Sequence, residues 1–321
     1  MKISYELNPP KIMISGDYFD AMRLKEELQI LLNRSSELVN LVNGIHLTDS
    51  VLGIPRVSSI TAASYIMKNA ADIKRLKLSC SVRTRDRNFT SFCQFVTDAI
   101  LVGVESLLIL KGDKPAGVDV DVAAADDVAV AASKDVAEEE EDDHGKKEGR
   151  EGGKGERERE EEEEVIGRRR RRTGQVQKSS GLKPTSILSF LNDKKYNNSI
   201  HLNLSVPSKI SYYHNRSLLE KKIEARPYSW VTQLISSLSD LGEIVDIAKS
   251  FKIKVVACIM VPSDKNRRSA DIIGLDWKEY EKNPVDFIKA ASTLADEVLI
   301  SSPNSFRTGI ELLRSLGRLL Q

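Results

Sequence analysis

The chain alternates short β-branched runs with longer amphipathic runs, and this alternation restricts its fold more than any other feature of the sequence. A short apolar run typical of a strand is followed eight times by a run with helical periodicity. Regular alternation of this kind implies parallel strands that are joined by helical crossovers. Eight such units predict a closed (β/α)8 barrel, an α/β fold of the TIM-barrel type.

The boundaries of these units follow from the apolar pattern. The expected strands lie at 3–6, 44–48, 77–82, 106–110, 200–206, 228–233, 254–260 and 297–301. The expected helices lie at 18–33, 58–69, 88–101, 184–192, 215–225, 239–251, 277–294 and 306–319. An open doubly wound sheet is the alternative, but it would need a glycine-rich turn after the first strand. The turn here is LNPPK, which has no glycine.

One segment, residues 117–180, departs from the alternation. It opens with VDVDVAAADDVAVAAS, continues through acidic runs and contains five consecutive arginines at 168–172. Because it has no aromatic residue, it cannot bury enough apolar surface to offset the entropy lost on ordering. We interpret it as a disordered charged insertion after the fourth strand. The arginine run is either a patch for an anionic partner, a targeting signal, or a solvated run whose charge the nearby glutamates cancel. The last interpretation is favoured.

Length and composition fit a single barrel that this insertion interrupts. Without the 64 residues of the insertion, 257 of the 321 residues remain. A (β/α)8 barrel typically has about 250 residues. The chain has 48 basic and 47 acidic residues, so as a whole it has no general attraction for nucleic acid or an anionic membrane. We therefore expect one domain and no nucleic-acid partner.

The cysteines, histidines and apolar runs exclude further classes of protein. Three cysteines lie far apart and give neither a disulfide framework nor a paired metal-ligand spacing. Four scattered histidines give no metal site, so no metal is expected. No apolar run reaches the roughly 18 residues of a membrane span, and the start MKISYELNPP does not have the pattern of a signal peptide. The expectation is a cytoplasmic protein with no membrane association.

Polar side chains gather at the ends of the predicted strands, where a barrel places its active site. They belong to Glu6, Thr48, Asp49, Ser81, Arg83, Arg85, Lys111, Asp113, Thr232 and Gln233, with Gly112 between Lys111 and Asp113. Strand ends are commonly exposed to water, which accounts for serines and lysines there. It accounts less well for Glu6 between Tyr5 and Leu7, or for Gln233 between Thr232 and Leu234.

Five segments, in this order along the chain, resemble the methylenetetrahydrofolate reductase family. SYELNPPK (residues 4–11) is similar to the family's SFEFFPPK, and HLTDSVLGIPRVSS (46–59) to VTDNPLGRPRMSS. Residues 83–115 resemble its CRDRN helix and LALxGDxP strand, and EKKIEARPYSWVTQ (220–233) resembles RKVEAGADFIITQ. ACIMVPS and SSPNS match the last two strands more loosely. The resemblance covers nearly all of the chain outside the insertion.

The resemblance implies a flavin-dependent oxidoreductase, in the short form without a regulatory domain. Such an enzyme passes reducing equivalents from NAD(P)H or another reductant to the flavin. It then passes them as hydride to 5,10-methylenetetrahydrofolate, or to a related pterin one-carbon carrier, and gives the 5-methyl form used in one-carbon metabolism and methionine biosynthesis. FAD is expected rather than FMN. The implied partner is the folate or modified pterin substrate; a homo-oligomer and an electron-transfer partner subunit both stay open.

Three residues take catalytic or substrate-binding roles by this resemblance. Glu6 matches the family's general acid, which protonates a folate nitrogen as the bridged ring opens, and burial would have to raise its pKa for that task. Asp113 matches the aspartate of the GD motif, which stabilises the resulting cation. Gln233 matches the glutamine that binds the pterin through its amide, beside Glu6.

The implied flavin-binding residues are Thr48, Ser81, Leu110, Lys111, Gly112, Asp113 and Lys222. Thr48 would donate to the ring near its reactive nitrogen, and Lys222 would pair with a cofactor phosphate. Gly112 would let the backbone approach the ring closely. Ser81 stands where the family has a histidine.

Simpler interpretations stand beside these assignments. Thr48 is also an ordinary strand end, and Asp113 an ordinary turn residue. Lys222 lies in a helix rich in lysine and glutamate, where a surface role is common. Residues 85–88 are expected to cap and salt-link the third helix rather than to contact a ligand. The alternative function is a non-catalytic barrel homologue that acts as a subunit or regulatory partner.

Deleting residues 120–178 tests the interpretation of the insertion. We expect a folded barrel with an unchanged cooperative thermal transition, because a segment that buries little apolar surface adds little to stability. Circular dichroism of the deletion variant measures this. Global unfolding of the variant would show that the segment is structural.

Overall fold

Eight parallel strands form a closed barrel in the computed structural model, which describes residues 1–12, 19–70, 72–113, 181–212 and 216–318. Neighbouring strands pair in chain order, and the first strand pairs with the eighth to close the sheet. The strands are β1 (Ile3–Leu7), β2 (Gly44–Leu47), β3 (Lys77–Arg83), β4 (Ser106–Leu110), β5 (His201–Val206), β6 (Ser229–Leu234), β7 (Lys254–Met260) and β8 (Glu297–Ser301). The closure confirms the predicted (β/α)8 barrel and excludes the open sheet.

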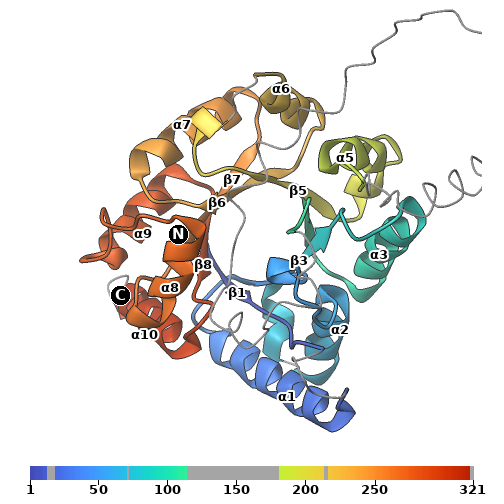
Figure 1. The fold of residues 1–321 in the computed structure, drawn as a ribbon, viewed down its shortest axis with the longest axis horizontal. Helices are drawn as coiled ribbons and strands as arrows, with labels where there is room; N and C mark the ends of the chain where they lie inside the picture. Colours follow the sequence, from blue (N-terminus) through green and yellow to red (C-terminus); the bar gives the residue numbers. More distant parts are fainter. Residues whose placement is uncertain (13–18, 71, 114–180, 213–215, 319–321) are drawn as a thin grey trace, which may run out of the picture. The chain divides into compact units, whose positions relative to one another are not determined.

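Helices surround the strands (Figure 1). The α-helices that the structure describes are α1 (Ala21–Leu38), α2 (Ser59–Asn69), α3 (Phe89–Val102), α5 (Pro184–Asp193), α6 (Arg216–Glu224), α7 (Leu238–Ser250), α8 (Asp264–Ile273), α9 (Pro284–Leu294) and α10 (Phe306–Arg318). None of these helices combines the length and the apolar character needed to cross a membrane. The predicted insertion at 117–180 lies outside the described residues.

Several helices begin at residues whose side chains accept hydrogen bonds from the first free backbone N–H groups. Asp20 caps α1, Ser58 caps α2 and Asn88 caps α3. Such caps satisfy donors that have no partner inside the helix, and each contributes about 1 kcal/mol. The cap at Asp20 also explains why α1 begins at Ala21 and not at residue 18 as predicted.

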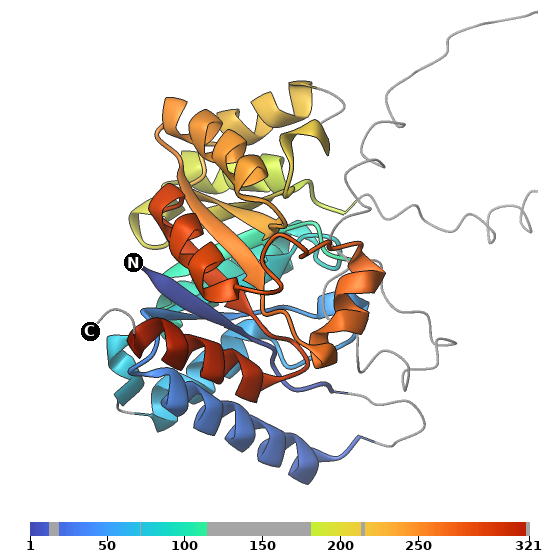
Figure 2. The ribbon, with the colours of Figure 1, turned by 90° about the vertical axis from the view of Figure 1, so that its left-hand side faces the viewer.

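The predicted helix at 277–294 is wrong in its first half, and a helix before it was missed. The structure has α8, capped by Ser263 and ended by Gly274 in the left-handed conformation, and then α9. Pro284 at the start of α9 disfavours helix at the residue before it, and Asn283 caps the new helix instead. Seen from the side, α8 lies at the end of the barrel away from the N-terminus, the end to which β1 runs (Figure 2).

The two faces of the barrel differ in chemistry. Side chains that point toward the helices are apolar and fully buried, such as Tyr5, Leu107 and Trp230. Alternation along each strand directs the others inward, and these include Glu6 on β1, which pairs with His46 on β2. Apolar burial between sheet and helices therefore supplies the stability, and the interior holds polar groups such as Glu6 and His46 together with apolar ones such as Leu108 and Met260.

Gly309 on α10 provides a test of this packing. A Cβ at Gly309 would lie 2.7 Å from Cε2 and 2.8 Å from Cζ of Tyr5, whose buried ring is also held edge-on by Phe306 with centroids 5.8 Å apart. We expect Gly309→Ala to lower the free energy of unfolding by about 1–3 kcal/mol, the usual effect of overpacking. Urea denaturation measures it.

Gly242→Ala is the matched control, because a Cβ at Gly242 in α7 meets nothing within 4 Å. This variant is expected to be as stable as the wild type or more stable by about 0.5–1 kcal/mol, the helix preference of alanine over glycine. Equal stability of the two variants would contradict the packing described for α10 on β1.

Candidate functional site

Glu6 lies inside the barrel one residue before the end of β1. The hydroxyl of Ser301, at the end of β8, donates to its Oε1 at 2.7 Å. Burial raises the pKa of Glu6 above its usual range, and the hydrogen bond from Ser301 opposes this shift without cancelling it. Glu6 is therefore a carboxyl group that keeps its proton to a higher pH than an exposed glutamate does.

Cys258 on β7 faces the same part of the interior. Burial raises the pKa of its thiol well above the usual value, and the carboxyl of Glu6 raises it further. The thiol therefore keeps its proton to a higher pH than an exposed cysteine does, which disfavours a role as a nucleophile. Its place beside Glu6 adds to the apolar surroundings of the carboxyl group.

His46 on β2 lies beside Glu6 in the sheet register and bonds to the third strand. Its Nδ1 lies 2.7 Å from Ser79 Oγ and its Nε2 lies 2.8 Å from Ser81 Oγ, so both ring nitrogens are occupied by hydroxyls of β3. Burial lowers the pKa of His46 to about 4, which keeps the ring neutral. Ser81, which is predicted to contact a flavin, is thus held by a histidine from the neighbouring strand.

Arg83 fixes the loop that follows β4. Its buried guanidinium donates to the backbone carbonyl groups of Ser50 and Asp113, and its Nε lies 2.8 Å from Asp86 Oδ2. Gly112 has a φ of +86°, and a Cβ there would lie 2.9 Å from Cγ and 3.0 Å from Cδ of Arg83. Glycine is therefore required at 112 by the left-handed backbone and by the arginine packed against it.

Thr48 follows β2 and is buried at its carboxyl end. Its hydroxyl donates to Asn8 Oδ1 at 2.6 Å, and its backbone N–H donates to Leu7 O at 3.2 Å. Because Leu47 pairs with Cys80, Thr48 and Ser81 follow side by side in the sheet. The two hydroxyls predicted to contact a flavin are therefore neighbours, and each is already bonded to a protein group.

Two further predicted residues, Lys222 and Gln233, lie at β5 and β6, across the barrel from β1 and β2. Lys222 reaches from α6 to the end of β5, where its Nζ donates to Ser205 O at 2.8 Å. Gln233 is half-buried on β6, in a stretch where the register against β7 shifts between Val231 and Leu234. Such irregularities change the direction of a side chain and are frequent beside active sites.

Parallel pairing brings these residues to one end of the barrel. Glu6, Leu110 and Gln233 lie at or next to the carboxyl ends of β1, β4 and β6, and Lys111 to Asp113 continue from β4. A shared site requires its residues to lie at the same end of the barrel, and these residues do. Their assigned roles stay predictions.

The residues that start α3 have the structural roles expected of them. Asn88 caps the helix by accepting from Ser91 N at 2.8 Å, and Asp86 pairs with Arg83. Arg87 lies 3.6 Å from Asp49 and stacks over Phe95. Within the described part of the chain, no group of three or more histidine, cysteine, aspartate or glutamate side chains is arranged to hold a metal.

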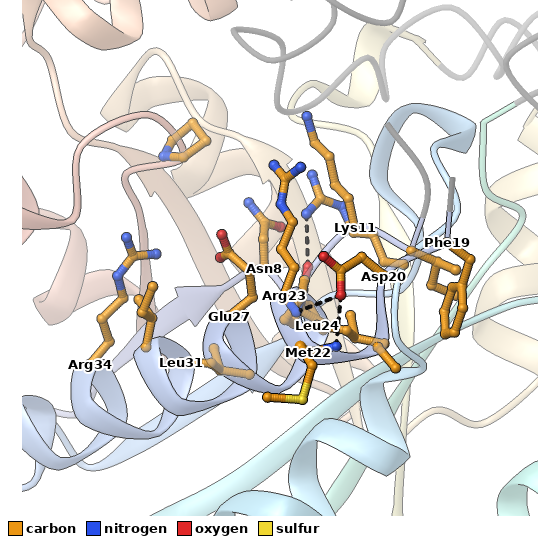
Figure 3. Close-up of a pocket in the computed structure, with 17 residues that line it drawn as sticks. Asn8, Lys11, Phe19, Asp20, Met22, Arg23, Leu24, Glu27, Leu31 and Arg34 are labelled. Atoms are coloured by element: carbon orange, nitrogen blue, oxygen red, sulfur yellow. Dashed lines mark hydrogen bonds between the residues drawn. The ribbon is translucent and has the colours of Figure 1, made fainter. Parts of the chain in front are cut away.

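A pocket of about 800 Å³ borders this end of the barrel on the side of α1. We call it the α1 pocket (Figure 3). Its lining residues are Asn8, Pro9, Pro10, Lys11, Ile12, Phe19, Asp20, Ala21, Met22, Arg23, Leu24, Glu27, Ile30, Leu31, Arg34, Arg56 and Pro303. Asn8 connects it to the candidate site, because Asn8 accepts the hydrogen bond of Thr48.

Sequence reasoning did not identify the partners of the candidate residues. Ser301 and Cys258 lie on the last two strands, where the sequence match is loose, and no local pattern marks them. His46 has the one usable signal, a polar residue between the apolar Ile45 and Leu47, which predicts an inward side chain. Its bonds to two serines depend on the register of β2 against β3.

Comparisons with known proteins concern the fold alone. No family model and no curated protein matches the chain. Among solved structures, the aldolase QR15 is 13% identical with a TM-score of 0.46, over 99% of this chain and 95% of that one. A ligand-free tryptophan synthase from M. tuberculosis is 10% identical with a TM-score of 0.47, over 98% and 89%. Tryptophan synthase from Pyrococcus furiosus is 9% identical with a TM-score of 0.47, over 99% and 97%. The barrel assignment rests on the strand pairing itself.

The lowered pKa of His46 predicts a specific acid sensitivity. Between about pH 6.5 and pH 4 the unfolded chain binds a proton at this residue and the folded chain does not, so the stability present above pH 6.5 is lost as the pH falls. At about 1.4 kcal/mol per pH unit, the loss amounts to about 3 kcal/mol.

The measurement is the difference in free energy of unfolding between the wild type and His46→Gln at several pH values. The hydrogen bonds lost in the variant lower its stability by the same amount at every pH. Because only the wild type has the buried His46, only the wild type loses stability through it as the pH falls from 6.5 to 4, and the difference shrinks. A difference that does not change with pH would contradict the neutral, buried histidine.

Proposed function

We propose that the chain is a flavin-dependent oxidoreductase that reduces 5,10-methylenetetrahydrofolate, or a related pterin one-carbon carrier, to its 5-methyl form. The observation that carries the proposal is Glu6, a partly buried carboxyl group with a raised pKa at the end of the barrel where such sites occur. Among the described residues no cationic side chain pairs with Glu6, so its burial costs stability, and a general acid that must keep its proton near neutral pH accounts for that cost.

The chain's own groups fit a flavin in their chemistry. Thr48 and Ser81 offer neighbouring hydroxyls, and Lys222 offers an ammonium group at the end of β5. The left-handed turn at Gly112 is explained by Arg83, which fills the space that a side chain there would take, and it gives no support for a flavin. When bound, the flavin supplies the hydride, and FAD is preferred to FMN on the resemblance alone. NAD(P)H or another reductant would reduce it.

Each residue then has a task that its surroundings permit. Glu6 donates its proton to a nitrogen of the substrate, and Ser301 Oγ, 2.7 Å from its Oε1, orients the carboxyl group. Asp113 stabilises the cation that forms, and Arg83 holds the position of Asp113 through its backbone carbonyl. Gln233 hydrogen-bonds the pterin through its amide.

One observation favours the second candidate, a non-catalytic barrel homologue that acts as a subunit or regulatory partner. The Thr48 hydroxyl donates to Asn8, and the Ser81 hydroxyl bonds His46. For Thr48 to donate to a flavin, its hydroxyl has to rotate away from Asn8. A non-catalytic homologue that acts only as a subunit needs no such rotation.

The visible absorption spectrum of the purified protein separates the two candidates. A bound flavin gives its characteristic absorption bands, either as purified or after reconstitution with FAD. Colourless protein that does not take up FAD or FMN would rule out the flavoenzyme and favour the second candidate.

Glu6→Gln tests the assigned general acid in the flavin-loaded enzyme. The variant is expected to bind the flavin and accept electrons from the reductant normally, while reoxidation by methylenetetrahydrofolate slows by about 100-fold or more. Anaerobic stopped-flow absorbance measures both half-reactions.

Glu297→Gln is the matched control. Glu297 on β8 accepts a hydrogen bond from Ser4 on β1, just as Glu6 on β1 accepts one from Ser301 on β8. Its reoxidation rate should stay within about twofold of the wild type, because a carboxyl group at the other end of the strand cannot donate to the substrate. Undiminished reoxidation in Glu6→Gln would show that its role is wrong.

A further inference from the structure

The α1 pocket concentrates positive charge at one of its ends. Of its charged residues, Lys11, Arg23, Arg34 and Arg56 are cationic, and Asp20 and Glu27 are acidic. The Asp20 carboxylate already caps α1, because its Oδ1 accepts hydrogen bonds from the backbone N–H groups of Met22 at 2.8 Å and Arg23 at 3.1 Å. The pocket therefore has an excess of positive charge.

Lys11 and Arg56 face each other directly across an antiparallel bridge. The flanking hydrogen bonds run from Ile12 N to Pro55 O at 3.0 Å and from Val57 N to Pro10 O at 2.9 Å. This pattern makes Lys11 and Arg56 a non-hydrogen-bonded pair, the arrangement in which opposite side chains are closest. Two like charges in such a pair repel each other, and an anion placed between them would be attracted to both.

Arg56 is the best-buried of these cations. Its Nη1 donates to Pro9 O at 2.8 Å, and its Nε is buried without a hydrogen-bond partner in the described part of the chain. No carboxylate pairs with it among the described residues, and burial lowers its pKa to about 10. A guanidinium held in this way has donors left for a ligand.

Arg23 completes the cluster from the first turn of α1. In Figure 3 the side chains of Lys11 and Arg23 project in the same direction, whereas Met22 and Phe19 point the other way. Arg34 lies on the same helix eleven residues further along, which is about 16 Å at 1.5 Å per residue. The cluster of cations therefore consists of Lys11, Arg23 and Arg56, and Arg34 lies outside it.

We propose that Lys11, Arg23 and Arg56 form a binding site for an oxyanion of the phosphate or carboxylate class. The planar guanidinium groups match the paired oxygens of either anion, and the ammonium group of Lys11 adds a compact charge beside them. The site is independent of the proposed redox function. It borders the candidate site through Asn8, so its occupant is either a separate anion or an anionic group of a ligand bound there.

Isothermal titration calorimetry of the full-length protein with pyrophosphate and with citrate tests the proposal at physiological ionic strength. We expect a dissociation constant below about 1 mM for at least one of them. Tighter binding of pyrophosphate assigns the site to phosphate groups, and tighter binding of citrate assigns it to carboxylates. Failure of both anions to bind would overturn the proposal.

Three variants locate the site. Arg56→Gln and Arg23→Gln are each expected to weaken binding roughly tenfold, through loss of a charge-assisted hydrogen bond. Arg34→Gln is the matched control, because it removes the same charge from the same pocket at a distance beyond the roughly 8 Å screening length. It should change binding less than about twofold.

Arg56 also supports the backbone at Pro9, so a thermal transition is recorded for each variant. If Arg56→Gln alone is unfolded, Arg23→Gln decides the outcome. Equal weakening by Arg23→Gln and Arg34→Gln would show nonspecific attraction to a basic surface and would overturn the site. None of these measurements depends on flavin or on redox activity, so this proposal and the proposed function can fail separately.

Discussion

The pairing of β1 with β8 is the constraint on which the rest of the structure depends. It joins the first strand to the last and turns a row of parallel strands into a closed wall. Two serine–glutamate bonds cross this seam in opposite directions, from Ser301 to Glu6 and from Ser4 to Glu297. Closure therefore both completes the barrel and gives Glu6 the neighbour that orients it.

Polar groups line part of the interior of this wall, and three of them at the candidate site, Glu6, His46 and Arg83, are bonded to other protein groups. Glu6 has Ser301, His46 has two serines, and Arg83 has two backbone carbonyls and a carboxylate. Burial without such partners would cost several kcal/mol per group. Apolar packing outside the barrel, with Tyr5 against α10 as one example, offsets the cost of burying these polar groups.

The sequence was sufficient for the strands because their signal is local. All eight were placed within one or two residues, since β-branched runs bounded by polar residues depend little on their surroundings. The connection after β7 was predicted wrongly, because Trp277 and Tyr280 gave an apolar pattern typical of helix although they lie buried in a non-helical segment. For the site, the sequence indicated strand-end residues such as Glu6 and Thr48, but not their partners.

By itself, the sequence determined the order of strands and helices, and hence the closed barrel and the end of it where Glu6, Asp113 and Gln233 lie. Periodicity and parallel connection need no distant contact to be recognised. Only the tertiary structure decided which groups meet: Ser301 with Glu6, Ser79 and Ser81 with His46, and Lys11 with Arg56. The serine pairs depend on the register between neighbouring strands, where a shift of one residue would turn each side chain to the other face, and Lys11 and Arg56 meet in an isolated bridge outside the strands.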